Sequence, residues 1–343
     1  MVEMGAIGLG GLGHLILDAY AEMADVNLVA GTDVSSKARE AFEAEYDAPA
    51  YEEHEAMLDG HGDALDAVTI VTPHTLHYGQ AMDCLRADLD VLLEKPMVTD
   101  MGDAVDLVTT VDERDRVLQV GYQRHFHPGL RELRRVVAGG RIGDVHTVNC
   151  YLGQEWIDVQ RGTWRTNPSL SGGGQLYDTG SHLLDAMLWT TGGTPTSVVA
   201  EIEYAKPGID CNSALGVALD AGDRTAMASV GLTGDGVEMT PSEGYVVWGT
   251  EGRVSYSDER LVLAEGGQTT AVTTITADTD FGTLTEAKLA NFVESVTGEA
   301  DPAVPAENGL WVTALTEAAY EADETGERVD VAAMLDAACG AAE

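Results

Sequence analysis

The feature that most constrains the fold is a glycine run close to the amino terminus. Gly8, Gly10 and Gly13 have the spacing G-x-G-x-x-G, and the run stands between an apolar segment and a helical pattern. In such a run the first glycine allows a tight turn, the second lets a ligand approach the backbone, and the third lets the helix pack closely on the strand. Free N–H groups at the start of the helix then favour phosphate. The run, which includes Gly11 and Leu12, therefore predicts a dinucleotide-binding βαβ unit.

An aspartate follows at the end of the next predicted strand. Asp33 lies 20 residues beyond Gly13, a position from which a carboxylate can accept hydrogen bonds from the adenosine ribose. Because a carboxylate there would repel a 2′-phosphate, the sequence favours NAD over NADP. Lys37 and Arg39 lie close enough in the chain to leave NADP open. As an alternative, Asp33 could cap the helix that begins at Ser36.

About the first 120 residues alternate short apolar runs with helical patterns, which is typical of a parallel sheet with crossover helices. Strands are predicted at 2–8, 27–33, 65–71, 89–93 and 117–120, with helices at 11–23 and 36–46 and after each of the later strands. This pattern predicts a Rossmann domain over residues 1–121.

From about Tyr122 the pattern changes to runs rich in Val, Thr and Tyr, punctuated by Gly and Asp, which indicate a mostly antiparallel sheet. Its strands are predicted at 145–154, 197–204, 215–220, 225–232, 245–249, 261–264 and 269–275, with helices at 130–137, 284–296 and 310–324. The expected fold class is therefore α/β, with a second α/β domain over residues 122–343 that contains an open, mostly antiparallel sheet.

The composition excludes several kinds of partner. With 58 acidic and 19 basic residues the formal charge is −39, which repels nucleic acid and anionic membranes. Lysine is scarce, and this composition is typical of a cytosolic protein of a halophile. No basic leader and no apolar run of membrane-spanning length is present, so we expect a cytoplasmic protein. The four cysteines are far apart and predict neither a zinc site nor a disulfide framework.

One of the scarce lysines follows an apolar strand. Lys95 stands between Glu94 and Pro96. A chain that avoids lysine but retains it here suggests that the ammonium is needed, because lysine offers a compact, titratable charge that arginine cannot imitate. The alternative is a simple ion pair with Glu94 on a loop.

A second polar cluster follows the strand predicted at 65–71. In an open parallel sheet, ligands bind beyond the carboxyl ends of the strands. We therefore expect Thr72, Pro73 and His77 to lie near the dinucleotide. His74 and His77 could instead form an H-x-x-H metal pair, but no third ligand stands at a recognisable spacing, so no metal is predicted.

A third cluster opens the helical segment that follows the glycines at 172–174. Asp178 and His182 are four residues apart, so on a helix they share one face. A histidine can take up a proton near neutral pH, and a nearby carboxylate can orient it or bind substrate hydroxyls. Two alternatives remain: Asp178 could cap the helix while His182 packs in the core, or both could form a metal-binding face with Asp185.

Taken together, these motifs resemble the Gfo/Idh/MocA oxidoreductases, which include glucose–fructose oxidoreductase and inositol dehydrogenases. The resemblance covers essentially the whole chain, and it is carried by the glycine run, Thr72-Pro73, Glu94-Lys95-Pro96, 121–126, 172–182 and the closing 326–329. It implies an NAD(P)-dependent dehydrogenase of a sugar, inositol or related polyol. It also implies a homodimer or homotetramer packed through the sheet of the second domain.

The resemblance implies roles for individual residues. Lys95 would contact the nicotinamide ribose and the reacting hydroxyl, Asp178 would bind substrate, and His182 would transfer the proton. Further cofactor contacts would come from Glu94 and Gln123. Oxidation of a secondary alcohol requires a base for the hydroxyl proton and a cation for the developing alkoxide, which suits this set. Whether Lys95 or His182 is the formal base is left open.

Substrate contacts are expected from a further group of residues: Tyr122, Arg124, Trp156, Trp164 and Arg165. The aromatic and arginine side chains at 154–167 suit apolar ring faces and hydroxyl groups, although that segment could also be a surface loop with an aromatic anchor. Many relatives carry a second arginine where this chain has His125, which leaves the anion contact of that arginine open.

Two other functions remain possible. Some family members use NAD transiently to cleave glycosides, and such an enzyme would cleave an aryl glycoside without net formation of NADH. A non-catalytic regulator that senses dinucleotide and sugar is the other candidate. Such proteins tend to lose the catalytic residues, so the retention of Lys95, Asp178 and His182 argues against it.

Overall fold

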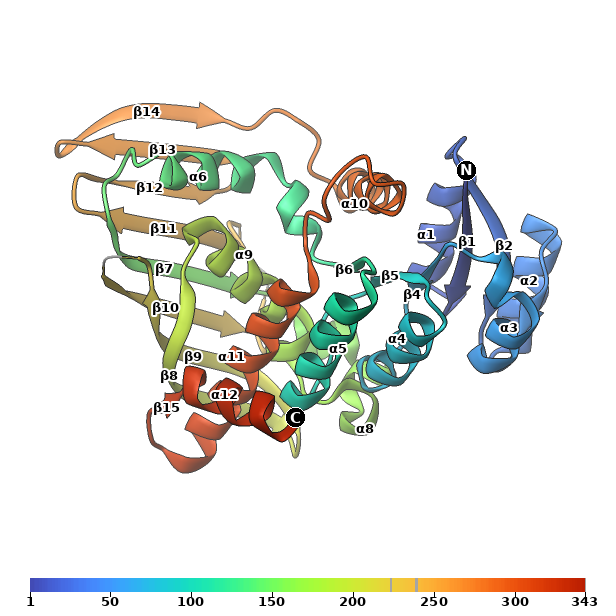
Figure 1. Cartoon of the computed structure of the whole chain (residues 1–343). Helices are drawn as coiled ribbons and strands as arrows, with labels where there is room; N and C mark the ends of the chain where they lie inside the picture. Colours follow the sequence, from blue (N-terminus) through green and yellow to red (C-terminus); the bar gives the residue numbers. More distant parts are fainter. Residues whose placement is uncertain (223, 238–239, 343) are drawn as a thin grey trace. The chain divides into compact units, whose positions relative to one another are not determined.

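The computed structural model describes residues 1–222, 224–237 and 240–342 and divides the chain into two compact units (Figure 1). Unit 1 comprises Met1–Val98, Asp103–Gln123 and Asp280–Gly309, and unit 2 comprises Thr99–Gly102, Arg124–Thr279 and Leu310–Glu343. The change of character near residue 122 was expected. The return of the chain to unit 1 at Asp280–Gly309 was not, because the sequence analysis assigned that segment to the second domain.

Unit 1 contains a six-stranded parallel sheet in the order β3-β2-β1-β4-β5-β6. Its strands are β1 Val2–Ile7, β2 Val26–Thr32, β3 Ala50–Tyr51, β4 Ala67–Ile70, β5 Asp90–Leu93 and β6 Leu118–Val120. Its helices are α1 Leu12–Ala21, α2 Ser36–Tyr46, α3 His54–His61, α4 His77–Arg86, α5 Met101–Arg114, whose first two residues belong to unit 2, and α10 Phe281–Val296. The predicted Rossmann fold is confirmed, and the sequence analysis missed only the short elements β3 and α3.

The late segment of unit 1 belongs to its core. Leu289 and Phe292 of α10 pack in one buried cluster with Met4 of β1 and with Ile16 and Tyr20 of α1. Strands β4 and β5 are buried along their whole length, as expected for a parallel sheet covered by helices on both faces.

Unit 2 contains a nine-stranded sheet in the order β14-β13-β12-β11-β7-β10-β9-β8-β15. Strands β7 and β10 pair in parallel and the other neighbours pair antiparallel, so the predicted open, mostly antiparallel sheet is confirmed. The strands are β7 Val145–Gly153, β8 Thr194–Lys206, β9 Ile209–Asp220, β10 Thr225–Thr233, β11 Glu243–Gly249, β12 Gly252–Ser257, β13 Arg260–Glu265, β14 Gln268–Thr274 and β15 Val329–Asp330. The sequence analysis missed β12 and β15.

One face of this sheet is covered by helices. The helices of unit 2 are α6 Pro128–Ala138, α7 Trp156–Gln160, α8 Pro168–Ser171, α9 Ser181–Thr191, most of α11 Ala306–Thr325, and α12 Val331–Ala342. Helix α6 packs on β12 and helix α9 on β7 (Figure 1). Strand pairing places Tyr151, Val199 and Met227 together on one face of the sheet, where all three are exposed.

No helix in the described ranges combines the length and the apolar character that crossing a bilayer requires.

Candidate cofactor and active site

The glycine run forms a turn that leaves no space for side chains at two positions. Gly8 has φ 93°, and a Cβ there would lie 2.2 Å from the carbonyl oxygen of Val71. A Cβ on Gly13 would lie 2.0 Å from the carbonyl oxygen of Gly8. At Gly11, by contrast, a Cβ would meet nothing within 4 Å, and no side chain caps the start of α1 there. The turn therefore fits a dinucleotide, whose phosphates the open N–H groups of α1 would bind.

Asp33 ties the glycine turn to the end of β2. Its Oδ2 accepts a hydrogen bond from the N–H of Leu9 at 2.9 Å, and its Oδ1 accepts one from Ser35 at 2.8 Å. The N-cap of α2 is Ser35 rather than Asp33. The Arg39 guanidinium, which left NADP open in the sequence, donates to the Asp33 carbonyl at 2.6 Å and lies 3.6 Å from the Glu52 carboxylate. Each Asp33 carboxylate oxygen retains a lone pair that could accept a ribose hydroxyl.

The Glu94 carboxylate is buried and engaged by a lysine distant in sequence. Its Oε1 forms an ion pair with Nζ of Lys288 in α10, and its Oε2 accepts a 3.3 Å hydrogen bond from the backbone N–H of Lys95. The alternative prediction was an ion pair between Glu94 and Lys95. In the structure the carboxylate of Glu94 forms its ion pair with Lys288 and accepts only the backbone N–H of Lys95. The sequence analysis missed Lys288.

His77 lies fully buried between two loops. Its Nδ1 is 2.8 Å from the carbonyl oxygen of Pro96, and its Nε2 is 3.0 Å from that of Thr72. Because both ring nitrogens face carbonyl groups, the structure gives no support to a metal pair with His74. Burial, the largest influence, lowers the pKa of His77, and the two carbonyl contacts oppose this effect. Thr72 in turn donates its hydroxyl to Gln80 at 2.6 Å.

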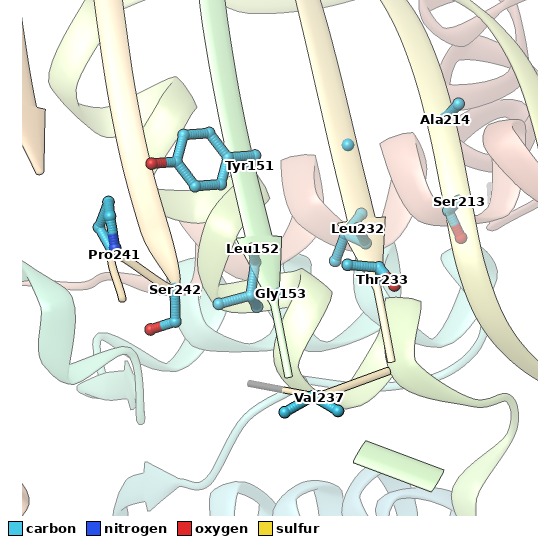
Figure 2. Close-up of a pocket in the computed structure, with 11 residues that line it drawn as sticks. Tyr151, Leu152, Gly153, Ser213, Ala214, Leu232, Thr233, Val237, Pro241 and Ser242 are labelled. Carbon is cyan, nitrogen blue, oxygen red and sulfur yellow. The ribbon is translucent and has the colours of Figure 1, made fainter. Parts of the chain in front are cut away.

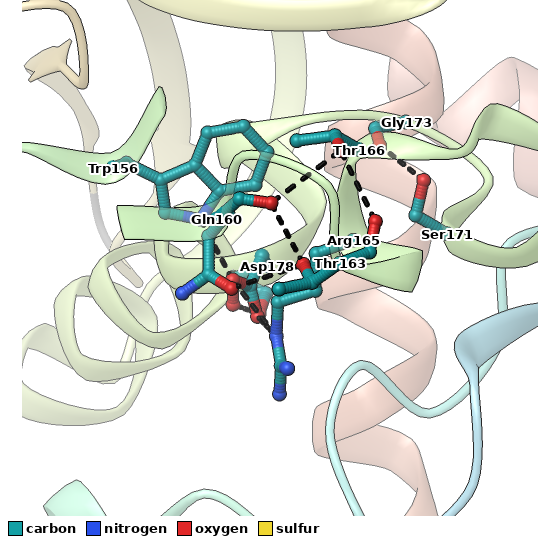
Figure 3. A network of polar contacts seen from close by, with 9 residues as sticks. Trp156, Gln160, Thr163, Arg165, Thr166, Ser171, Gly173 and Asp178 are labelled. Carbon is teal, nitrogen blue, oxygen red and sulfur yellow. Dashed lines mark hydrogen bonds and ion pairs between the residues drawn. The ribbon is translucent and has the colours of Figure 1, made fainter. Parts of the chain in front are cut away.

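Asp178 is buried and held by side chains of unit 2 (Figure 3). The indole N–H of Trp156 donates to Oδ2 at 2.7 Å, and Nε of Arg165 donates to Oδ1 at 3.3 Å. The Arg165 guanidinium also stacks over the Trp164 ring at 4.4 Å. The structure thus brings two of the predicted substrate-binding residues to Asp178, and the third, Trp164, to Arg165.

The free end of Arg165 points away from this network in Figure 3. Within the described part of the chain, no hydrogen bond or ion pair engages its terminal Nη atoms. They are therefore available to a ligand oxygen.

The helical segment that carries the predicted catalytic pair is irregular. Asp178 lies in a π-helical turn, Leu176–Gly180, and His182 lies in the first turn of α9, where it is buried. Such turns occur often at functional sites. Asp210 holds the start of the segment by accepting hydrogen bonds from the N–H groups of Gly174 and Leu176, both at 2.7 Å. Burial raises the pKa of Asp210, and the sequence analysis missed this residue.

Of the remaining alternatives for this segment, a packed His182 agrees with the burial of its side chain, whereas the other two receive no support. Asp178 is occupied by Trp156 and Arg165 rather than by the backbone of a helix start. Asp185 pairs with His125, with Nε2 3.0 Å from Oδ2, so it does not join a metal face with the other two residues. Clusters with metal-ligand geometry in the described ranges lie elsewhere: His14, Asp18 and Glu45, and His54, Glu55 and Asp83.

Three other predicted contact residues are consecutive in the sequence, at 122–124, where the chain passes from unit 1 to unit 2. Arg124 forms a partly buried ion pair with Glu243, the Tyr122 ring is fully buried, and Gln123 begins a short 3₁₀ turn. Their roles in binding stay predictions.

A hollow of about 520 Å³ lies elsewhere in unit 2, where β7 and β10 end (Figure 2). Its lining is largely apolar and includes Tyr151, Leu232, Val237 and Pro241. None of the predicted site residues lines it, so the hollow is separate from the Asp178 network.

Comparison with known proteins agrees with this architecture. Residues 2–122 match the family profile described as "Oxidoreductase family, NAD-binding Rossmann fold", and residues 130–255 match "GFO/IDH/MocA C-terminal domain". The chain is 26% identical to the rhizopine catabolism protein MocA of Rhizobium meliloti, over 93% of this chain and 94% of that protein. It is 27% identical to the D-xylose 1-dehydrogenase [NADP(+)] of Haloarcula marismortui, over 80% of this chain and 78% of that protein.

A solved structure shows the same fold. The WlbA dehydrogenase from Bordetella pertussis, in complex with NADH and UDP-GlcNAcA, has a TM-score of 0.80 and 22% identity, over 96% of this chain and 98% of that one. With both domain profiles matched in order and the glycine turn built for a dinucleotide, the chain belongs to the GFO/IDH/MocA family of NAD(P)-binding oxidoreductases.

Proposed function

We propose that the protein is an NAD-preferring dehydrogenase that oxidises a secondary hydroxyl of a sugar, inositol or related polyol. The observation that carries this proposal lies in unit 1. Ile7, Ile70 and Leu93 are the last residues of β1, β4 and β5, and each is paired with its neighbour across the sheet. The glycine turn and Lys95 therefore leave the sheet at the same edge, which puts a titratable ammonium beside the expected dinucleotide site.

The side chains suit the chemistry of alcohol oxidation. A bound dinucleotide supplies the acceptor for the hydride that leaves the substrate carbon. Lys95 stabilises the oxygen as negative charge develops. His182 accepts the hydroxyl proton, and Asp178 accepts a hydrogen bond from a neighbouring hydroxyl. Lys95 belongs to unit 1, and Asp178 and His182 belong to unit 2.

The preference for NAD rests on Asp33 and Arg39. The carboxylate stands at the end of β2, where a 2′-phosphate would meet negative charge. Arg39 donates to the Asp33 carbonyl and lies near Glu52, and these two contacts compete with a phosphate for its guanidinium.

A screen for NADH formation tests the function. The full chain in molar KCl is incubated with a panel of sugars and inositols, with NAD and NADP in parallel, and absorbance of the reduced cofactor is followed. We expect reduction that depends on a polyhydroxylated alcohol and is faster with NAD. Cleavage of an aryl glycoside without net reduction would contradict the proposal in favour of the hydrolase. Dinucleotide binding without turnover of either kind would favour the regulator.

We further propose that the protein works as a homo-oligomer at high salt. Tyr151, Val199 and Met227 expose apolar surface on one face of the nine-stranded sheet, and packing of two such faces would remove it from water. A charge of −39 opposes both folding and association, and it is strongly screened only when the Debye length falls to about 3 Å near 1 M salt.

Sedimentation and thermal melting test this proposal. We expect a dimer or tetramer in 2 M KCl that Met227→Glu dissociates, and a melting temperature that rises from 0.1 to 2 M KCl. A monomer at every salt concentration, or a melting temperature that salt leaves unchanged, contradicts the corresponding part.

A further inference from the structure

We infer that Lys288 and His77 are positioning residues that hold the catalytic lysine in place from its two sides. The inference rests on the proposed role of Lys95. The residue before Lys95 is tied to Lys288 through the Glu94 carboxylate, and the residue after it, Pro96, offers its carbonyl oxygen to His77. Neither positioning residue needs to touch substrate or cofactor for this effect.

Lys288 occupies an environment that lysine rarely tolerates. Its side chain is 1% exposed, and its neighbours in α10, Leu289 and Phe292, belong to the apolar core of unit 1. A buried ammonium is unfavourable unless it is paired, and here the partner is Glu94. The backbone is fixed as well, because the side-chain amide of Gln119 donates to the Lys288 carbonyl at 3.1 Å.

Glu94 transmits this restraint to Lys95. One carboxylate oxygen pairs with Lys288, so the other is directed to the backbone N–H of Lys95 at 3.3 Å. The carboxylate occupies the space that a side chain at position 121 would need, since a Cβ on Gly121 would lie only 2.8 Å from its atoms. The position of the Lys95 backbone therefore depends on an ion pair with a helix that lies almost 200 residues later in the chain.

His77 acts on the other side of Lys95. Its buried ring lies between the carbonyl oxygens of Thr72 and Pro96, at 3.0 and 2.8 Å. The ring thus joins the loop after β4 to the loop that carries Lys95. The neutral ring donates from one nitrogen only, so without it one carbonyl group would lose its donor and the two loops would lose their link.

Stability alone is a weak explanation for this arrangement. Replacing a buried ion pair by apolar side chains is often neutral or stabilising, whereas removing one partner leaves a buried charge. A positioning role and a structural role therefore make different predictions when Lys95 itself is absent.

A double-mutant cycle between Lys288 and Lys95 separates the two roles. Turnover, NAD affinity and melting temperature are measured in molar KCl for the unmodified full chain, Lys288→Met, Lys95→Ala and the double variant. We expect Lys288→Met to lower kcat by about 10- to 100-fold, the loss that a displacement of roughly 1 Å produces, with little change in KM. In the Lys95→Ala background the same substitution should change residual turnover by less than about threefold. His77→Gln should behave in the same way.

Two further variants serve as controls for the loss of Lys288. Lys206→Met removes an exposed lysine at the end of β8 and should leave turnover unchanged. If Lys288→Met does not fold, Glu94→Gln/Lys288→Met removes both charges; it should melt near the unmodified protein and still turn over slowly. An equal loss in the presence and absence of Lys95, or normal turnover of either Lys288 variant, overturns the inference.

Failure of the proposed function is recognised separately. If no substrate is turned over, the rate of Lys95 acetylation is measured by mass spectrometry, with the exposed Lys206 as internal standard. The chain has four lysines, so the acetylated peptides are easily told apart. We expect Lys288→Met to change the Lys95 rate relative to Lys206. An unchanged ratio would overturn the inference independently of the dehydrogenase assignment.

Discussion

The predicted cofactor-binding residues of unit 1 and the predicted substrate-binding residues of unit 2 are held in place by different means, and we call these two sets the backbone half and the side-chain half. At the carboxyl edge of the unit 1 sheet, the backbone half depends on backbone geometry: Gly8 and Gly13 leave no space for a Cβ. In unit 2 the side-chain half depends on side chains that hold one another, since Trp156 and Arg165 both donate to Asp178. Backbone geometry at a glycine tolerates no side chain at all, whereas a side-chain network can change its specificity one residue at a time.

A single glycine substitution in the backbone half should abolish dinucleotide binding. We expect Gly13→Ala to abolish measurable dinucleotide binding and to lower the melting temperature by roughly 10 °C or more, because its Cβ would lie 2.0 Å from the carbonyl oxygen of Gly8. Gly10→Ala separates binding from packing: its Cβ would be 3.9 Å from the nearest atom, Oδ2 of Asp33, so it should weaken binding and leave melting unchanged. Calorimetric titration and thermal melting measure both quantities. Normal NAD binding by Gly13→Ala would break the comparison.

Loss of the proposed base should affect chemistry alone. We expect His182→Ala to lower kcat by ~10²–10⁴-fold, with partial recovery at high pH where hydroxide can replace the imidazole. Lys95→Ala should lower kcat by ~10²–10³-fold. Steady-state kinetics from pH 6 to 10, with NAD titration in parallel, provide the measurement. Unimpaired turnover of His182→Ala would remove this residue from the mechanism.

Substitutions in the side-chain half should lower kcat/KM by smaller amounts, one hydrogen bond at a time. Trp156→Phe keeps an aromatic ring but removes the N–H that donates to Asp178. A hydrogen bond to a charged group contributes about 1.5–3 kcal/mol, so kcat/KM should fall by roughly 10- to 150-fold while NAD affinity is unchanged. Trp248→Phe, in β11 of the same unit, is the matched control. An equal effect of the two substitutions would argue that the Asp178 network does not set substrate binding.

The smallest effect should be on cofactor choice. Asp33→Ala removes the carboxylate and should weaken NAD by about tenfold while NADP changes little, because lost hydrogen bonds and lost repulsion act in opposite directions for NADP. Asp33→Asn retains an oxygen for the N–H of Leu9 and isolates the contribution of charge. Fluorescence titration with both dinucleotides measures the ratio. Tighter binding of NADP than of NAD by the unmodified protein would make the assignment of Asp33 wrong.

The features that could be predicted from the sequence depend on interactions between residues close together in the chain. Helix α2 begins and ends as predicted, at Ser36 and Tyr46, because its boundaries are set by nearby residues. The glycine turn was predictable for the same reason. The contacts that were missed join distant segments: Glu94 with Lys288, His125 with Asp185, and Arg124 with Glu243.

One of these contacts left a trace in the sequence. Leu284, Lys288 and Phe292 recur every four residues in the predicted helix at 284–296, which places a lysine on an apolar face. In a chain with four lysines, that position indicates a buried partner, but nothing in the spacing identifies Glu94. Side-chain partners depend on tertiary packing, which a single sequence does not encode in local patterns.

The late segment Asp280–Gly309 has a consequence for biosynthesis. Residues 1–98 of unit 1 are synthesised before unit 2, yet Phe292 completes the apolar core of unit 1 only after most of unit 2 has been made. A nascent chain that ends at residue 123 would expose the surface that α10 covers, and Glu94 would lack the ammonium of Lys288. The dinucleotide-binding half, although first in sequence, is therefore expected to mature last, when α10 emerges and docks.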